Sequence, residues 1–127
     1  MLAIGTAALI AGGFITAAPA AADGQACWPS GCASSPAAGA RFVSHGDIFY
    51  VRDYRADGKA TAGMIEYYVP GEGWYRPGEW VVYNRNGYAG PPEKRNYEIA
   101  EGSQVRYMSC LVNGSTLDCT DWRYDRA

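Results

Sequence analysis

The 127-residue sequence has a single histidine, His45, and lacks the G-x-S-x-G motif that presents a nucleophilic serine. A catalytic triad needs a histidine beside a nucleophile and an acid, and zinc sites need closely spaced Cys or His residues. The carboxylates Asp53 with Asp57, and Asp118 with Asp121, are close in sequence, but turns also favour Asp. We therefore predict a non-catalytic protein without cofactor or metal, with a small hydrolase that uses a carboxylate pair as the alternative.

The chain also lacks an excess of positive charge. Eleven Lys and Arg residues stand against thirteen Asp and Glu residues, which gives a formal net charge of −2. A protein of this balance has no general positive field to attract nucleic acids or anionic lipids. We predict no nucleic-acid partner.

Residues 1–22 lack any charged side chain and are mostly Ala, Leu, Ile and Gly, ending in APAAA. An apolar run followed by small residues is typical of a secretory signal peptide. The absence of Lys or Arg before the run leaves open a start upstream of Met1. An uncleaved membrane anchor is disfavoured, because the run is short and diluted by Gly and Thr. We expect cleavage to release residues 23–127 as a secreted, extracellular monomer without a membrane segment.

Four cysteines, an even number in an exported chain, predict two disulfides. Cys27 and Cys32 flank a short loop, so a local bridge is the simplest pairing. Cys110 and Cys119 flank Asn113-Gly114, which favours a hairpin turn. Directly opposed residues have Cα atoms about 4.5–5.5 Å apart, within the range of about 4.4–6.8 Å that is usual for a disulfide. A bridge between the two ends of the chain remains an alternative.

Two registers follow from the turns. With Cys110 opposite Cys119, Tyr107 lies opposite Trp122 and Val105 lies opposite Tyr124, which would turn Trp122 and Tyr124 toward the core. In a separate hairpin, a three-residue loop over 56–58 sets Phe49 opposite Ile65. This register collects the apolar side chains of both strands on one face.

From residue 41 onward the hydrophobic pattern alternates with period two, and no window has a useful helical stripe. Short runs rich in Val, Ile, Tyr, Phe and Trp predict strands at 41–45, 47–55, 61–70, 80–84, 96–100, 104–112 and 117–124. We predict an all-β antiparallel sandwich of about seven strands over 41–127, immunoglobulin- or fibronectin-like, closed by the disulfide-stapled hairpin. Residues 23–40 would form a disulfide-looped head and a small-residue linker that does not pack.

The least strand-like region is 71–79, which carries Trp74, Tyr75 and Arg76 between glycines. Exposed aromatic rings beside an arginine are typical of binding surfaces, and Tyr88 lies in a second loop. We predict that these four residues contact an extracellular protein, including a hydrolase that it would inhibit, or a glycan. The opposing interpretation is that Trp74 folds back as a plug over the end of the sandwich.

Residues 41–127, with GDIFYVRDYRADGKATAG and VRYMSCLVNGSTLDCTDW, resemble the small exported proteins of high-GC Gram-positive soil bacteria. These proteins typically show a strand, an ADG turn, a strand and a final cysteine-bridged hairpin. The resemblance implies export and a β fold but no activity and no functional residues.

Overall fold

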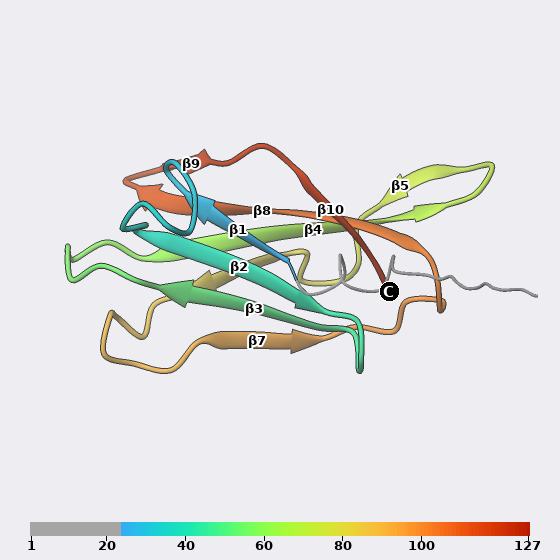
Figure 1. The fold of residues 1–127 in the computed structure, drawn as a ribbon, viewed down its shortest axis with the longest axis horizontal. Helices are drawn as coiled ribbons and strands as arrows, with labels where there is room; N and C mark the ends of the chain where they lie inside the picture. The colour runs from blue at the N-terminus through green and yellow to red at the C-terminus, as the bar shows by residue number, and fades with distance from the viewer. Residues whose placement is uncertain (1–23) are drawn as a thin grey trace, which may run out of the picture.

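The computed structural model describes residues 24–127, so the predicted signal peptide over 1–22 lies outside the described residues. This part of the chain contains strands and no helix (Figure 1). The strands are β1 (Gln25–Trp28), β2 (Ala38–Val43), β3 (Ile48–Asp53), β4 (Thr61–Val69), β5 (Gly73–Tyr75), β6 (Val81–Asn84), β7 (Glu93–Asn96), β8 (Gln104–Asn113), β9 (Thr116–Cys119) and β10 (Arg123–Arg126). The all-β prediction is confirmed for residues 24–127, and nine strands, β2 to β10, lie wholly or partly within 41–127, where about seven were predicted.

The strands form two antiparallel sheets. A four-stranded sheet has the order β1-β2-β3-β7. A six-stranded sheet has the order β10-β8-β4-β5, with β6 also paired to β4 and β9 to β8. Figure 1 shows the β4–β5 hairpin projecting from one end of the molecule, while the connection from β3 to β4 lies at the other end.

The core lies between the two sheets. Inward side chains of β1, β2, β3, β4, β6 and β8 pack into one buried cluster. The largest fully buried apolar members are Phe42, Phe49 and Val51 from the four-stranded sheet and Ile65, Val82, Val105 and Tyr107 from the six-stranded sheet. The Phe49 and Tyr107 rings meet edge to face at 5.7 Å and so join the two sheets.

The predicted hairpin between the second and third strands is wrong, although its choice of inward side chains is right. Phe49 pairs with Phe42 on β2 and with Arg95 on β7, whereas Ile65 pairs with Tyr107 on β8. The chain between β3 and β4 crosses from one sheet to the other. Alternation determines which face a side chain occupies, but it does not determine which strand lies beside it.

The expectation that residues 33–40 do not pack is also wrong. Ala37, Ala38 and Ala40 are buried, and β1 pairs with β2 in register from Gln25 to Trp28. Small side chains fit here because β2 is an interior strand of its sheet, with a neighbour on each side. The head predicted for 23–40 therefore contributes β1 and the start of β2 to the four-stranded sheet.

Both predicted disulfides are confirmed. Cys27 and Cys32 are bridged with Cα atoms 5.0 Å apart, and Cys110 and Cys119 are bridged with Cα atoms 4.0 Å apart. Cys110 lies directly opposite Cys119, as the hairpin register requires.

Beyond the second disulfide the predicted register is wrong by one residue. Tyr107 lies opposite Arg123, not Trp122, because the returning chain has one extra residue between Cys119 and Arg123. The Thr120 amide donates to the Ser109 carbonyl, so the ladder is intact up to that point. An extra residue in one strand is a bulge, and it reverses the face on which every later side chain lies.

At Gly63 on β4 the two sheets lie so close together that a side chain would not fit between them. A Cβ atom there would lie 2.7 Å from Val51 Cγ2 and 2.9 Å from Phe49 Cζ. Both neighbours are fully buried and belong to the facing sheet. The missing side chain therefore sets how closely the two sheets pack at this point.

We expect Gly63→Ala to destabilise the protein by about 1–3 kcal/mol, because the new methyl group must displace two packed core side chains. Gly78→Ala is the matched control, since a Cβ at Gly78 meets no atom within 4 Å. Its effect should stay within about 0.5 kcal/mol. Urea unfolding of both variants measures the difference, and equal stabilities would contradict this account of sheet packing.

Candidate functional site

The segment predicted as a contact loop is a short hairpin. β5 pairs with the end of β4, so that Trp74 lies opposite Tyr68 and Tyr75 lies opposite Tyr67. Gly71 and Gly73 have φ angles of 82° and 108°, a region that side chains disfavour, and they make the tight turn possible. Because neighbours on a strand face opposite ways, Trp74 and Tyr75 lie on different faces. The prediction of a strandless loop over 71–79 is therefore wrong.

Trp74 belongs to an ordered stack on the outer face of the six-stranded sheet. Its ring meets the rings of Tyr68 at 5.3 Å and Tyr124 at 5.9 Å, both edge to face. The Arg106 guanidinium lies 4.2 Å from the centre of the Trp74 ring and 4.5 Å from that of Trp122. We call Tyr68, Trp74, Arg106, Trp122 and Tyr124 the arginine–aromatic stack.

The one-residue bulge explains why Trp122 and Tyr124 join this stack. Tyr124 lies opposite Arg106, an outward position of β8, and its side chain is 56% exposed. The prediction that Trp122 and Tyr124 face the core is therefore wrong. Trp122 is half-buried against the Arg106 guanidinium.

Glu66 ties the stack to Arg76. Its side chain is only 6% exposed, and it pairs with Arg106 at 2.6 Å and with Arg76 at 3.0 Å. The Arg76 guanidinium also lies 3.9 Å from the centre of the Trp80 ring. One carboxylate therefore holds two guanidinium groups, and each of these covers an aromatic ring.

Opposing effects act on the pKa of Glu66. Burial of the carboxylate raises its pKa, because desolvation disfavours the charged form. The hydrogen bonds and positive charges of Arg76 and Arg106 together outweigh burial, and the pKa lies below its ordinary value of 4.5. Glu66 is therefore ionised at neutral pH, and the two ion pairs are intact.

The structure brings together only two of the four predicted contact residues. Trp74 and Arg76 both lie on the outer face, where they are linked because Arg106 contacts the Trp74 ring and Glu66 pairs with both arginines. Tyr75 faces the other way, and its hydroxyl donates a hydrogen bond to Glu72. That hydrogen bond raises the pKa of Tyr75, with a smaller contribution from desolvation.

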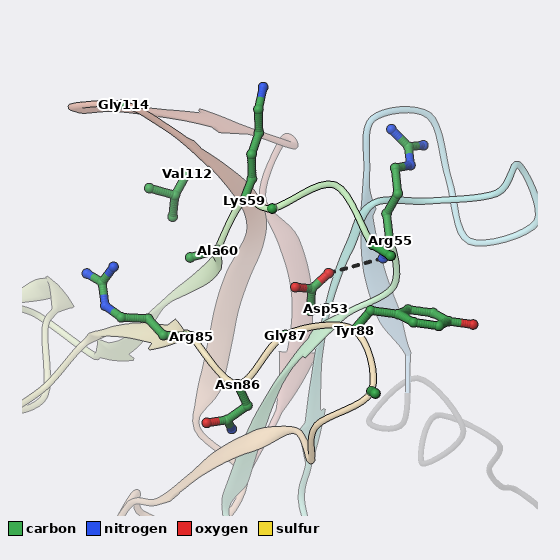
Figure 2. Close-up of a pocket in the computed structure, with 13 residues that line it drawn as sticks. Asp53, Arg55, Lys59, Ala60, Arg85, Asn86, Gly87, Tyr88, Val112 and Gly114 are labelled. Carbon is green, nitrogen blue, oxygen red and sulfur yellow. Dashed lines mark hydrogen bonds between the residues drawn. The ribbon is translucent and has the colours of Figure 1, made fainter.

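Tyr88 lies elsewhere, at the rim of an open hollow of about 890 Å³ (Figure 2). The hollow includes Ala60, just before β4, whereas Trp74 pairs with Tyr68 near the end of β4. Ala60 and Tyr68 are eight residues apart, and at a rise of about 3.3 Å per residue of strand they lie roughly 25 Å from each other. Tyr88 therefore belongs to a different surface from Trp74, and its predicted role in binding stays a prediction.

The hollow in Figure 2 has cationic side chains around its rim, and most of them already have partners. Arg55 donates to the Ser35 carbonyl at 2.9 Å, and the Arg85 guanidinium lies 4.8 Å from the Tyr83 ring. The buried Asp53 carboxylate accepts the Arg55 amide at 3.0 Å. These contacts order the turn before β4 and do not form a converging set of ligand donors.

Two of the four carboxylates considered for catalysis, Asp53 and Asp57, are used in a turn. Asp53 accepts the amide two residues later, and Asp57 accepts the Lys59 amide at 2.9 Å. Such contacts are typical of Asp in turns. Asp118 accepts the Asn113 side-chain amide at 3.3 Å across the final hairpin.

Sequence reasoning missed Glu66, Trp80, Arg106, Trp122 and Tyr124 as members of this surface. The sequence contained part of the information needed to place Glu66 with the aromatic residues, because Glu66 and Tyr68 are two residues apart and must share a face of their strand. Joining them to Arg106 needed the β4–β8 register, in which Glu66 lies directly opposite Arg106.

Neither a protein-family model, nor a curated protein, nor a solved structure matches this chain. Residues 24–127 contain no helix of the length and apolar character needed to cross a membrane. In the same described range, no three His, Cys, Asp or Glu side chains gather closely enough to hold a metal ion.

Glu66→Gln removes the charge that both guanidinium groups share, and we expect it to cost about 1.5–3 kcal/mol at pH 7. A carboxyl group with a lowered pKa stabilises the fold above its ordinary pKa and loses this contribution as pH falls through its folded value. The stability difference from the wild type should therefore be constant above about pH 5 and shrink below 4.5. Urea unfolding between pH 7 and pH 3 measures it.

Glu98→Gln is the control, because Glu98 is exposed and outside this cluster. Its stability difference from the wild type should be small at every pH. A difference for Glu66→Gln that stays the same at pH 3 would show that the ion pairs do not stabilise the fold.

Proposed function

We propose that the protein is a secreted, non-catalytic binding protein that recognises an extracellular protein through the outer face of its arginine–aromatic stack. The observation that carries this proposal is the ordering of exposed and half-buried aromatic side chains around a paired arginine. Trp74 and Trp122 flank Arg106, and the ring of the exposed Tyr124 meets Trp74. Trp, Tyr and Arg are the residue types most enriched at interface hot spots.

The stack is preorganised. Glu66 fixes the Arg106 guanidinium through two hydrogen bonds of 2.9 and 2.6 Å, and Arg106 in turn holds the indoles of Trp74 and Trp122. Side chains that are already ordered lose less conformational entropy on binding. A rigid surface of this kind favours a partner with a complementary, fixed shape.

A protein partner suits this surface better than a glycan. Sugars stack on open ring faces, but Arg106 already covers a face of Trp74 and one of Trp122. The rings of Tyr68 and Tyr124 further enclose Trp74. A hydrolase that the protein would inhibit is one partner of this kind, and an extracellular glycan is the alternative ligand.

Secretion is part of the proposal. The two disulfides indicate an oxidising environment, as found outside the cytosol. The leader-like residues 1–22 support export. We also propose that the exported protein is a monomer. We propose further that the two packed sheets form a sandwich of the immunoglobulin or fibronectin type.

The alternative of a small hydrolase receives less support. Asp53 and Asp57 each accept a backbone amide two residues later, which gives both carboxylates a role in the turn. A pair for glycoside cleavage needs two carboxyl groups positioned on either side of a substrate. The aromatic surface contains one carboxylate, Glu66, and it is buried between two arginines.

The test uses the mature protein as bait for proteins from the culture supernatant of the organism that makes it, and for insoluble polysaccharides. Affinity for the retained partner is then measured with Tyr124→Ala. We expect at least a tenfold loss of affinity with little change in melting temperature, because Tyr124 is 56% exposed and its ring contacts Trp74 at the surface of the stack.

Tyr88→Ala is the matched control, since Tyr88 is a tyrosine of similar exposure, 60%, on a different surface. It should leave affinity unchanged. If Tyr88→Ala weakens binding and Tyr124→Ala does not, the contact lies at the hollow and this proposal is wrong. Retention on polysaccharides alone, lost with Tyr124→Ala, would favour the glycan alternative.

A further inference from the structure

The outer face of the four-stranded sheet has a different chemistry. Its register places Gln25, Arg41, Tyr50 and Lys94 in one row across the strands, because each is directly opposite the next. Ala40 and Phe42 belong to the buried core, so the row that alternates with them faces outward. The next outward row across β1, β2 and β3 consists of Cys27, Gly39 and Arg52. These rows contain three cations and no carboxylate, although the chain as a whole is acidic.

This face is hollowed at Gly39. A groove of about 520 Å³ lies over β2, lined by Gln25, Gly39, Ala40, Arg41, Tyr50, Arg52 and Tyr54. A Cβ atom at Gly39 would lie 2.5 Å from Cε2 of Tyr54, so the Tyr54 ring closes over the space that the glycine leaves. The groove therefore depends on the absence of a side chain in the middle of β2.

The groove presents guanidinium groups that donate no hydrogen bond within the part of the chain that the structure describes. The Arg41 guanidinium lies 4.9 Å from the centre of the Tyr50 ring, and that of Arg52 lies 5.9 Å from the Tyr54 ring. Among residues 24–127, neither guanidinium forms an ion pair. This contrasts with Arg76 and Arg106 on the other sheet, which share Glu66.

A hydroxyl donor also remains. The side-chain amide of Gln25 donates to the Tyr54 hydroxyl at 3.0 Å, so the hydroxyl oxygen acts there as an acceptor. Its own proton is then directed to another acceptor. Arg41, Arg52 and Tyr54 thus bring two guanidinium groups and one hydroxyl to the lining of a groove that holds no acidic side chain.

We propose that this groove binds an acidic polysaccharide, a chain of sugars that carry carboxylate groups. A guanidinium group forms paired, charge-assisted hydrogen bonds with a carboxylate, and the groove has two such groups, those of Arg41 and Arg52. Tyr50 and Tyr54 are half-buried, and each offers an apolar ring with a polar tip, which suits a sugar ring and its hydroxyls. The proposal does not rest on the proposed function, which concerns the opposite sheet.

Other polymers fit this groove less well. Contacts that hold a protein partner are well packed and desolvated, whereas this groove has a lining that is polar apart from the tyrosine rings and Ala40, with Arg41 and Arg52 exposed. Nucleic acid carries a denser negative charge and is bound by proteins with many phosphate contacts. Three cations on a chain with a net charge of −2 do not supply such a field.

The test measures binding of the mature protein to polygalacturonate by affinity electrophoresis and calorimetry at low salt. Fully methyl-esterified polygalacturonate is the matched ligand control, because it keeps the sugars and loses the charge. We expect retention by the first and not by the second. Arg41→Ala with Arg52→Ala should weaken binding at least tenfold, since it removes both guanidinium groups from the groove.

Lys59→Ala with Arg85→Ala is the matched protein control, because both residues are exposed and neither lines the groove. It removes the same charge from residues that line the separate hollow near Tyr88, and binding should be unchanged. Tyr54→Phe should weaken binding severalfold while keeping the ring, which separates loss of the hydroxyl donor from loss of the fold.

Several outcomes would overturn the proposal. These are no binding to polygalacturonate, equal binding to the esterified polymer, or equal loss in the Lys59 and Arg85 control variant. Equal binding to polyglutamate or to single-stranded DNA would show general attraction to anions and would also overturn it. Loss of binding in the Tyr124→Ala variant would assign the polysaccharide to the stack surface instead.

Discussion

The pairing of β4 with β8 is the constraint on which the rest of the structure depends. One register, running from Thr61 opposite Leu111 to Tyr67 opposite Val105, determines both faces of the six-stranded sheet. On the inner face it sets Ile65 beside Tyr107, which reaches Phe49 of the other sheet. On the outer face the same register sets Glu66 opposite Arg106. A slip of one residue would bury the charged pair and expose the core.

The disulfide at the end of β8 and the bulge after it act on this register in different ways. Cys110 opposite Cys119 aligns the hairpin with β8, and one extra residue before Arg123 then changes which side chains face outward. Without that residue, Tyr124 would compete with the core for space. With it, Tyr124 lies opposite Arg106 and completes the stack. The bulge therefore makes β10 part of the arginine–aromatic stack on the outer face.

These details show what the sequence could predict. Alternation and turn residues correctly predicted an all-β chain, both disulfides and the burial of Phe49 and Ile65. Strand partners could not be derived, because period two assigns a face and not a neighbour. The bulge left no signal, since Thr, Asp and Trp also occur in regular strands. The site was predicted only where glycines marked the chain near Trp74, and Glu66 was missed because a charged residue in a strand is usually solvated.

The two outer faces differ in how their arginines are used, and this difference bears on function. On the six-stranded sheet a buried carboxylate neutralises one charge of the pair Arg76 and Arg106, so that the aromatic rings dominate the surface. On the four-stranded sheet Arg41 and Arg52 lie over tyrosine rings and keep their charge available. The first arrangement suits recognition by shape, and the second suits recognition by charge. Because the core separates the two faces, a ligand on one leaves the other accessible.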